Sequence, residues 1–588
     1  MTARGGSPRR APSAPAARRR EPSRLRVLGL LGIALLLSVT VWARLAYWQV
    51  LRHDQLSALA DAQHVANVTL PATRGLITDV DGRPLALNTT VYDVSLSPPS
   101  VQKSQRGRVE NGLAATLGVS ADDIAKLLAS GKKFAFVQRR VTKDKADQLS
   151  RMQLPGVLVT GLPERTYLDG GNPGTTLASG LLGFVDYAGQ GQRGVEQYYQ
   201  KPLGGTNGQT AVDLDSSGQP ILSTTHNRRD PVDGQNLQLT IDSDAQYIAE
   251  QAIAQGVQAS HALSGSVLIM DSKTGGIAAW ASWPGYDAND FATTDPAKTQ
   301  DPVASRLYEP GSVMKVVTLS GAIDAGAIKP DTVIDDPGYV MVQGWPIRDD
   351  ELVNQGQVTM TKVLDDSLNV GAVKAEQMEG RDNYLKYLRA FGFGHPADVG
   401  VAGEASAPIA PNGQWNDVSL ATASFGQGIA VNMVQMLAAI NTIANHGVYV
   451  QPHVVAKVGD TPVTPTEHRA VSTQTADEMD MMMRSVVQHG SGWKARLNGF
   501  ELDETGKTGT SQKPENGVYT QHVWASYVGF LPAINPRFTM LVMVNQPDNG
   551  SADANEGYYV SGPIWKQIAE QLVLRWQIAP EQLPPVGE

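Results

Sequence analysis

The sequence predicts an α+β protein whose folded part follows one N-terminal transmembrane helix. Residues 27–43 form an apolar run without a charge, which approaches the about 20 residues that span a bilayer. In the C-terminal half, strand-like segments lie early, at Ser266–Ala281, and late, at Ala525–Leu531 and Phe538–Val544, with helix-like segments between them. This order favours an antiparallel sheet flanked by helices, with a helical subdomain.

The composition narrows the possible chemistry. The 588 residues suffice for two or three domains, because compact domains usually contain about 100–200 residues. The chain contains no cysteine, which excludes disulfides, thiolate catalysis and cysteine-based zinc sites. We expect neither a metal ion nor a cofactor.

The apolar run has the flanks of a membrane anchor. Residues 1–26 carry eight arginines and one acid, Glu21, and basic residues mark the cytoplasmic side of a membrane helix. We therefore expect a basic cytoplasmic tail at 1–26 and an uncleaved single-pass anchor at 27–48, with the rest of the chain outside the cytoplasm. The aromatic belt of the far membrane surface would consist of Trp42, Tyr47 and Trp48.

Two other interpretations of this region are weaker. A basic block can bind nucleic acid, but a basic block directly before an apolar run favours a membrane, so we expect no nucleic-acid partner. A cleaved signal peptide would have a shorter apolar run and a clean Ala-x-Ala site just after it, which this sequence lacks.

The remaining chain divides near residue 235. Residues 49–235 read as short strands and helices broken by Gly and Pro, and Arg74–Ala86 has the pattern of a strand, an Asp-Gly turn and a strand. No catalytic motif stands out there, so we expect an elongated pedestal. A second domain is predicted at 236–577, and the proline-containing tail at 578–588 is predicted to be poorly ordered.

Three short motifs in the second domain carry side chains suited to nucleophilic catalysis. They are Ser312-Val-Met-Lys315, Ser367-Leu-Asn369 and Lys507-Thr-Gly-Thr510. None is specific alone, because similar motifs recur at Ser130–Lys133, Ser491–Lys494 and Lys273–Gly275. We interpret these recurrences as a solvated helix end, a flexible loop and a hairpin turn, respectively.

The setting of Ser312 distinguishes the first motif. Ser312 follows Glu309-Pro-Gly311 and opens an apolar run typical of a buried helix, so Ser312 and Lys315 share one helix face. The free N–H groups and the dipole of the first turn can stabilise a developing oxyanion. Because a buried lysine loses its charge more readily, Lys315 can take the Ser312 proton without help from a histidine.

The other two motifs have simpler alternatives. The segment Lys507–Thr510 can be an edge strand, whose Gly509 admits a substrate backbone, or only a turn. Ser367 and Asn369 stand beside the helix-forming segment Val370–Met378 and can be helix caps. The order of the three motifs along the chain favours the catalytic interpretation.

This ordered set resembles the motifs of penicillin-binding proteins and serine β-lactamases. Leu368 stands where the second motif often has aspartate, a departure that penicillin-binding proteins commonly show. The resemblance to class B penicillin-binding proteins, and most of all to the monofunctional septal type, also rests on Arg74–Ala86, Gly191–Glu196, Leu239–Asp242, Tyr308–Ser312 and Phe425–Ala430. It implies a dimerisation-type pedestal at 49–235 and a penicillin-binding transpeptidase domain at 236–577.

The resemblance further implies a peptidoglycan D,D-transpeptidase of cell wall synthesis, with the choice between division and elongation open. Ser312 would attack the D-Ala-D-Ala carbonyl of a stem peptide or its lipid-linked precursor, and a β-lactam would trap Ser312 by mimicking it. Lys315 would be the general base, and Ser367 and Lys507 would relay the proton to the leaving amine. The binding roles would fall to Asn369 at the substrate amide, to Thr508 and Thr510 at the terminal carboxylate, with Gly509 admitting the substrate backbone, and to the N–H groups of Ser312 and Thr510 at the oxyanion.

Three alternatives stay open at this point. A β-lactamase would share the motifs but is usually about half as long. A D,D-carboxypeptidase would form the same acyl-enzyme. A non-enzymatic scaffold or β-lactam sensor would act through the pedestal. The resemblance also implies a membrane-embedded glycosyltransferase and divisome proteins as partners.

Overall fold

The computed structural model describes residues 24–57, 65–214, 220–409, 415–500 and 502–587. The chain forms two compact units, one of Met1–Leu70 with Asn207–Pro231 and one of Pro71–Thr206 with Val232–Glu588. In the smaller unit, an antiparallel sheet contains, in this order, β1 (Val65–Leu70), β8 (Gly208–Leu214) and β9 (Pro220–Arg229).

The smaller unit also contains the expected apolar helix. Helix α1 (Arg24–Ala46) continues into a π-helical turn at Tyr47–Leu51. Within the part of the chain that the structure describes, Arg24–Leu51 is the one helix long and apolar enough to cross a membrane, and α1 buries none of its residues in protein. Most of the predicted basic tail, residues 1–23, lies outside the described residues.

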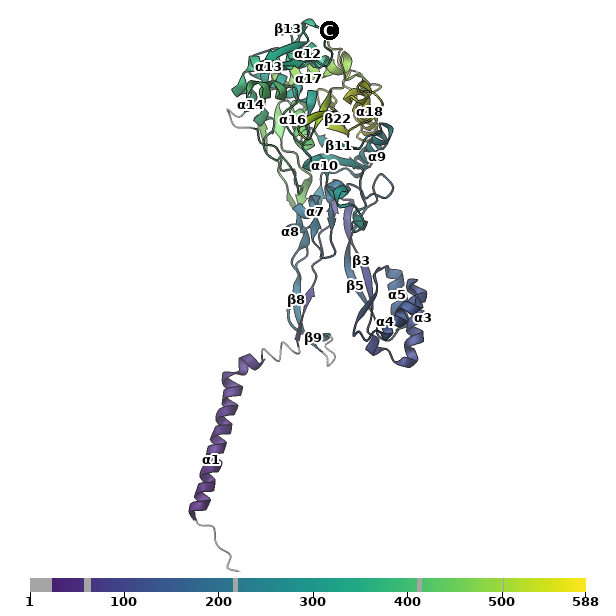
Figure 1. The fold of residues 1–588 in the computed structure, drawn as a ribbon, viewed down its shortest axis with the longest axis vertical. Helices are drawn as coiled ribbons and strands as arrows, with labels where there is room; N and C mark the ends of the chain where they lie inside the picture. The colour runs from purple at the N-terminus through teal and green to yellow at the C-terminus, as the bar shows by residue number, and fades with distance from the viewer. Residues whose placement is uncertain (1–23, 58–64, 215–219, 410–414, 501, 588) are drawn as a thin grey trace, which may run out of the picture. The chain divides into compact units, whose positions relative to one another are not determined.

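The larger unit begins with a long strand pair (Figure 1). Strand β3 (Pro84–Leu96) pairs with β5 (Val157–Tyr167) over 11 residues and with β4 (Ala135–Val141) toward its C-terminal end. Three helices cover this end around a small core of leucine and valine side chains: α3 (Arg106–Leu117), α4 (Ala121–Ala129) and α5 (Lys143–Met152).

The other end of β3 belongs to a sheet that joins segments far apart in sequence. Strand β2 (Ile77–Thr78) pairs antiparallel with β3 after the predicted turn, and parallel with β10 (Leu237–Leu239). Strand β10 in turn pairs with β18 (Val455–Val458), which pairs with β19 (Thr461–Pro462). Hydrogen bonds therefore connect strands on both sides of residue 235.

The sheet of the C-terminal domain confirms the predicted antiparallel architecture. Its strand order is β12-β11-β23-β22-β21, and every neighbouring pair is antiparallel. The early strand β11 pairs directly with the late strand β23. The strands are β11 (Ser264–Asp271), β12 (Ile277–Trp283), β21 (Lys507–Glu515), β22 (Val518–Leu531) and β23 (Phe538–Asn545).

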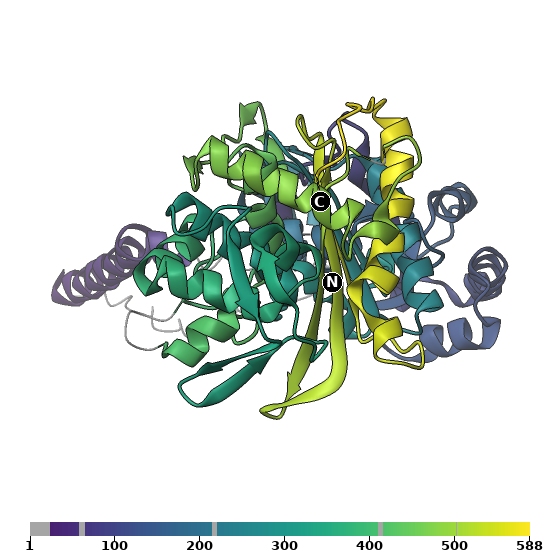
Figure 2. The same ribbon diagram turned by 90° about the horizontal axis from the view of Figure 1, so that it is seen from above.

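Helices cover both faces of this sheet (Figure 2). In β11, Val267 and Ile269 pack into the core beneath α9 (Ser243–Ala259) and the yellow helix α18 (Gly557–Arg575). The alternate residues Leu268 and Met270 join the larger core on the opposite face, as the two-residue period of a strand requires. The helices of that face are α11 (Met314–Asp324), α16 (Met433–Ala444) and α17 (Thr473–Gln488).

A helical subdomain adjoins α11, as predicted. It consists of α12 (Met360–Asp365), α13 (Asn369–Glu379), α14 (Arg381–Ala390) and α15 (Asp417–Ser424), with two antiparallel strand pairs. Strand β13 (Val333–Asp336) pairs with β16 (Gly356–Thr359), and β14 (Tyr339–Val342) pairs with β15 (Trp345–Arg348). The remaining short elements are α6 (Ser179–Leu182), β6 (Phe184–Val185), β7 (Gly191–Gln192), α7 (Gly194–Tyr198), α8 (Gln200–Gly204), α10 (Pro302–Ser305), β17 (Val448–Val450) and β20 (Glu467–Arg469).

Hydrogen bonds attach the C-terminal tail, within residues 578–587, to the rest of the domain. The N–H groups of Glu581, Gln582 and Leu583 donate to the Asp503 carboxylate over 2.6–3.1 Å. Further along, the guanidinium of Arg484 on α17 donates to the Pro584 carbonyl. Because the tail prolines lack N–H groups, few backbone donors of this segment need a partner. A few side chains of the domain therefore suffice to bind them, and no regular element is needed.

Candidate functional site

Ser312 lies in a 3-10 turn, Gly311–Val313, that leads directly into α11. Gly311 has a φ of +59°, and a Cβ atom there would stand 2.7 Å from the Thr510 carbonyl oxygen. The Gly311 N–H donates to the Gly426 carbonyl at 3.0 Å. Glycine therefore lets this turn pack directly against β21, the strand that carries the third motif.

Lys315 is fully buried one turn after Ser312. Its Nζ atom lies 3.0 Å from Ser312 Oγ and 3.2 Å from Ser367 Oγ, and it donates to the Ser367 carbonyl. Burial lowers the pKa of Lys315 to about 8, although the charges of three nearby aspartates act in the opposite direction. About a tenth of this amine is therefore neutral at pH 7, far more than for an ordinary lysine, and the neutral form can act as a general base.

Ser367 occupies the turn between α12 and α13 with a φ of +60°. This left-handed conformation is uncommon for serine and costs about 1–3 kcal/mol, and such strain gathers at functional sites. The N-cap of α13 is Leu368, without a side-chain cap, while Ser367 Oγ lies 2.9 Å from Lys507 Nζ. The helix-cap alternative for Ser367 is therefore wrong.

Lys507 is also fully buried, at the start of β21. Burial and the charge of Lys315 hold its pKa well below the usual lysine value. Two amines thus flank one hydroxyl, and their mutual repulsion opposes the state in which both are charged. Such an arrangement can move a proton along the path Lys315, Ser367, Lys507.

Strand β21 is an edge strand of the five-stranded sheet, so the turn alternative for the third motif is wrong. A Cβ atom on Gly509 would stand 2.5 Å from Ser526 Oγ and 2.9 Å from the Pro310 carbonyl oxygen. Thr508 Oγ1 lies 3.4 Å from Lys507 Nζ, and Thr510 Oγ1 accepts the Gly557 N–H at 3.1 Å.

Asn369 begins α13, two residues after Ser367, but its side chain turns to the preceding hairpin. Its amide donates to the Arg348 carbonyl at 2.9 Å, and its N–H donates to the Asp349 carboxylate. The structure therefore joins Ser312, Lys315, Ser367 and Lys507 in one hydrogen-bonded cluster. The Asn369 amide lies outside it and donates to the backbone at the end of β15.

The recurrent motifs differ in their surroundings. Ser130 ends α4 on the surface and donates to the Leu127 carbonyl, and Lys273–Gly275 forms the β11–β12 turn, so both interpretations are confirmed. Ser491 differs, because its Oγ atom lies 3.0 Å from Thr508 Oγ1. Our interpretation as a flexible loop missed this contact. The available signal was a serine between two glycines shortly before the third motif.

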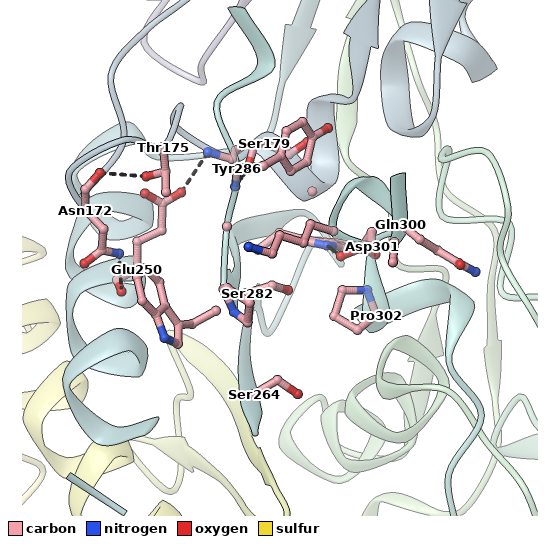
Figure 3. A pocket seen from close by; sticks show the side chains of 18 of the residues that line it. Asn172, Thr175, Ser179, Glu250, Ser264, Ser282, Tyr286, Gln300, Asp301 and Pro302 are labelled. Carbon is pink, nitrogen blue, oxygen red and sulfur yellow. Dashed lines mark hydrogen bonds between the residues drawn. The ribbon is translucent and has the colours of Figure 1, made fainter. Parts of the chain in front are cut away.

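A separate pocket of about 230 Å³ lies beside β12, the opposite edge strand from β21 (Figure 3). Its wall includes Ser282 of β12 and the buried Glu250, whose carboxylate accepts the N–H groups of Gly171 and Ala178 at 2.7 Å each. None of the three motifs contributes to its wall, so the motif cluster is a different site.

Comparisons with known proteins agree with this architecture. Residues 265–570 match the family model "Penicillin binding protein transpeptidase domain", and residues 69–239 match "Penicillin-binding Protein dimerisation domain". The chain belongs to the penicillin-binding protein transpeptidases. The resemblance seen in the sequence and the predicted fold class are thereby confirmed.

The similarity extends over most of the chain. Penicillin-binding protein PbpB of Mycolicibacterium smegmatis is 31% identical over 92% of this chain and 88% of that protein. Peptidoglycan D,D-transpeptidase FtsI of Escherichia coli is 30% identical over 94% of this chain and 92% of that protein.

Solved structures show the same fold. Penicillin-binding protein 3 from Mycobacterium tuberculosis, in a complex with aztreonam, matches with a TM-score of 0.68 and 27% identity, over 88% of this chain and 99% of that chain. Penicillin-binding protein 2X from Streptococcus thermophilus matches with a TM-score of 0.74 and 25% identity, over 87% of this chain and 81% of that chain.

Proposed function

We propose that the chain is a peptidoglycan D,D-transpeptidase that cross-links stem peptides through an acyl-enzyme on Ser312. The activity is that named for the Escherichia coli relative. The observation that carries the proposed site is the hydrogen-bonded cluster of one hydroxyl nucleophile, two buried amines and a bridging serine, drawn from three distant segments.

Acylation follows from this geometry. The neutral Lys315 amine takes the Ser312 proton while Ser312 Oγ attacks the carbonyl carbon of the penultimate D-alanine. The N–H groups of Ser312 and Thr510 stabilise the oxyanion. The C–N bond then breaks, and the proton passes from Lys315 through Ser367, with Lys507 beside it, to the leaving amine of the terminal D-alanine.

The second half-reaction releases the enzyme. An amine of a second stem peptide attacks the ester carbonyl and gives a proton to the neutral Lys315 amine. Ser312 then leaves with this proton, and a new amide bond cross-links the two stems. Thr508 and Thr510 hold the donor carboxylate at the β21 edge before acylation, and Gly509 between them admits the substrate backbone. Asn369 binds the substrate amide if its side chain leaves the Arg348 carbonyl.

We place this reaction outside the cytoplasm. The arginines before α1 favour a cytoplasmic N-terminus, with residues 49–235 as a pedestal and 236–577 as the catalytic domain. The substrate is a stem peptide, free or on its lipid-linked precursor, and β-lactams are inhibitors. A membrane-embedded glycosyltransferase and divisome proteins are the proposed partners of the anchor and pedestal.

One experiment tests the site and separates the alternatives. The purified chain is treated with a penicillin, and mass spectrometry locates the adduct; we expect a single stable acylation on the peptide that contains Ser312, absent in Ser312→Ala and present in the control Ser130→Ala. Rapid loss of the adduct would indicate a β-lactamase instead.

The natural reaction is followed with stem peptides. Cross-linked dimers support the transpeptidase, whereas shortened monomers alone would indicate a D,D-carboxypeptidase. Unchanged cross-linking by Ser312→Ala in cells would contradict the enzymatic role and favour a scaffold or sensor.

A further inference from the structure

Ser491 touches the ends of two motifs at once. Its N–H donates to the Asp365 carbonyl at 3.1 Å, two residues before Ser367. Its Oγ atom lies 3.0 Å from Thr508 Oγ1 in the third motif. Ser491 therefore bridges the end of α12, which leads to Ser367, and the edge strand β21.

The loop around Ser491 is held in place from several sides. The N–H groups of Gly490 and Gly492 both donate to the Val486 carbonyl at the end of α17, at 3.1 and 2.9 Å. A Cβ atom on Gly490 would stand 2.4 Å from the Asp365 carbonyl oxygen, so glycine is needed for this close approach. These contacts fix the position of the Ser491 hydroxyl.

The hydrogen-bonding capacity of Thr508 indicates which hydroxyl donates in the contact between Ser491 and Thr508. A threonine hydroxyl has one proton to donate and two sites that accept. Lys507, whether charged or neutral, keeps N–H donors and stands 3.4 Å from Thr508 Oγ1. If Ser491 also donates to Thr508 Oγ1, both accepting sites are filled, and the Thr508 proton is left for a third partner.

We infer that Ser491 is a positioning residue that donates to Thr508 Oγ1 and so directs the Thr508 proton to the terminal carboxylate of the substrate. This inference rests on the proposed function, in which Thr508 binds that carboxylate. Without the Ser491 hydroxyl, the Thr508 hydroxyl is free to turn and the preorganised hydrogen bond to the carboxylate is lost.

Valine and threonine at position 491 provide a matched test, because they share a shape and differ by the hydroxyl. Acylation is measured with a penicillin that carries its free carboxylate and with the methyl ester of the same penicillin. For the free carboxylate we expect Ser491→Val to lower the second-order rate constant about tenfold, as for one hydrogen bond to a charged group. We expect Ser491→Thr to retain the wild-type rate within a factor of about two.

The methyl ester separates a positioning role from a merely structural one, because a structural defect would slow acylation by both penicillins. The ester lacks the carboxylate charge, so we expect all three proteins to react with it at similar rates. Equal slowing of both penicillins by Ser491→Val, or equal rates for Ser491→Val and Ser491→Thr with the free carboxylate, would overturn the inference. If Ser491→Val does not fold, the same comparison is made between Ser491→Ala and Ser491→Thr.

A double variant gives independent evidence. In a Thr508→Val background, Ser491→Val should have no further effect on acylation by the free carboxylate, because the partner is already absent. A full additional loss would contradict the inference. Failure of the proposed function looks different, since the wild-type chain itself would then carry no adduct on Ser312.

Discussion

The Nζ atom of Lys507 lies 2.9 Å from the Oγ atom of Ser367, although 140 residues separate them in the sequence. Lys315 Nζ approaches the same hydroxyl from the other side at 3.2 Å. Ser367 is thus the one group in this cluster that touches both buried amines, and its removal interrupts the proposed proton path at its centre.

Ser367→Ala should therefore slow acylation by penicillin by about 10²–10³-fold, within the range expected for loss of general acid–base transfer. The measurement is the rate of covalent labelling at fixed pH. Ser130→Ala is the control, because the hydroxyl of this surface serine contacts the backbone of the α4 end, at the Leu127 carbonyl and the Lys132 N–H. A wild-type labelling rate in Ser367→Ala would exclude the relay.

The pH dependence of acylation should report the state of Lys315. Burial lowers the pKa of this amine to about 8, and the base is active when neutral, so the rate constant should rise with pH and level off above about 8. Below pH 7 the expected slope is about tenfold per pH unit. A rate independent of pH between 6 and 8 would exclude Lys315 as the base.

Asp350 offers a second test of Lys315 as the base, because the direction of the expected pH shift is known. Its charge raises the pKa of Lys315, so Asp350→Asn should move the midpoint of the pH profile to lower pH. Asp122→Asn makes the same charge change on α4 and should leave the midpoint unchanged. A shift to higher pH in Asp350→Asn would show that another group controls the profile.

Glu379 should make the stability of the domain depend on pH. It is buried on α13, and both carboxylate oxygens lack a hydrogen-bond partner within the described residues. Burial, with the charge of Glu376, raises the pKa of Glu379 to about 9. The folded state therefore keeps a proton that the unfolded state releases above about pH 4.5, and stability is lost as the pH rises from there toward 9.

Glu379→Gln removes this titration. The slope of the melting temperature against pH should be smaller in the variant than in the wild type between pH 5 and 9, whatever the absolute stability of the variant. Each pH unit in this window can cost the wild type up to about 1.4 kcal/mol. Parallel slopes would mean that Glu379 is ionised in the folded protein.

Glu196 should be the most sensitive position of the region before residue 235. Its fully buried carboxylate accepts the Nε–H groups of Arg74 and Arg165 at 2.7 Å each, and the hydroxyl of Tyr167 at 3.2 Å. Glu196→Ala leaves buried guanidinium groups without their partner, which costs about 3–5 kcal/mol.

The check on Glu196 is thermal or denaturant unfolding. Asp147→Ala breaks an exposed pair with Lys143 and should change the stability very little. Penicillin labelling of the Glu196→Ala protein that remains folded should proceed at the wild-type rate, because Glu196 lies outside the motif cluster. Equal stabilities of the two variants would contradict the proposed role of the buried network.

The sequence was informative where one local pattern had one structural meaning. Apolar runs of strand length predicted β22 and β23, and the Gly-Gly pair that follows Lys273-Thr274 predicted a turn. The sequence could not decide whether Ser367 was a helix cap or a catalytic residue, because serine suits both. The left-handed backbone and the contact to Lys507 exclude the cap, and the catalytic role stays a prediction.

Contacts between distant segments could not be predicted from the sequence for a different reason. The pairing of β10 with both β2 and β18 and the contact between Ser491 and Thr508 depend on the register of whole elements. The attachment of the tail could not be predicted either, because the carboxylate that accepts its N–H groups, Asp503, lies about 80 residues earlier.

The docked tail makes the C-terminus a natural reporter position. Val586 donates to the Gln488 side chain, and its carbonyl lies 3.1 Å from His489 Nε2, one residue before the Gly490–Gly492 loop. A fluorophore attached close to residue 586 would stand near that loop, so its emission could follow antibiotic binding in real time. Purification tags belong at the other terminus, where they leave this attachment undisturbed.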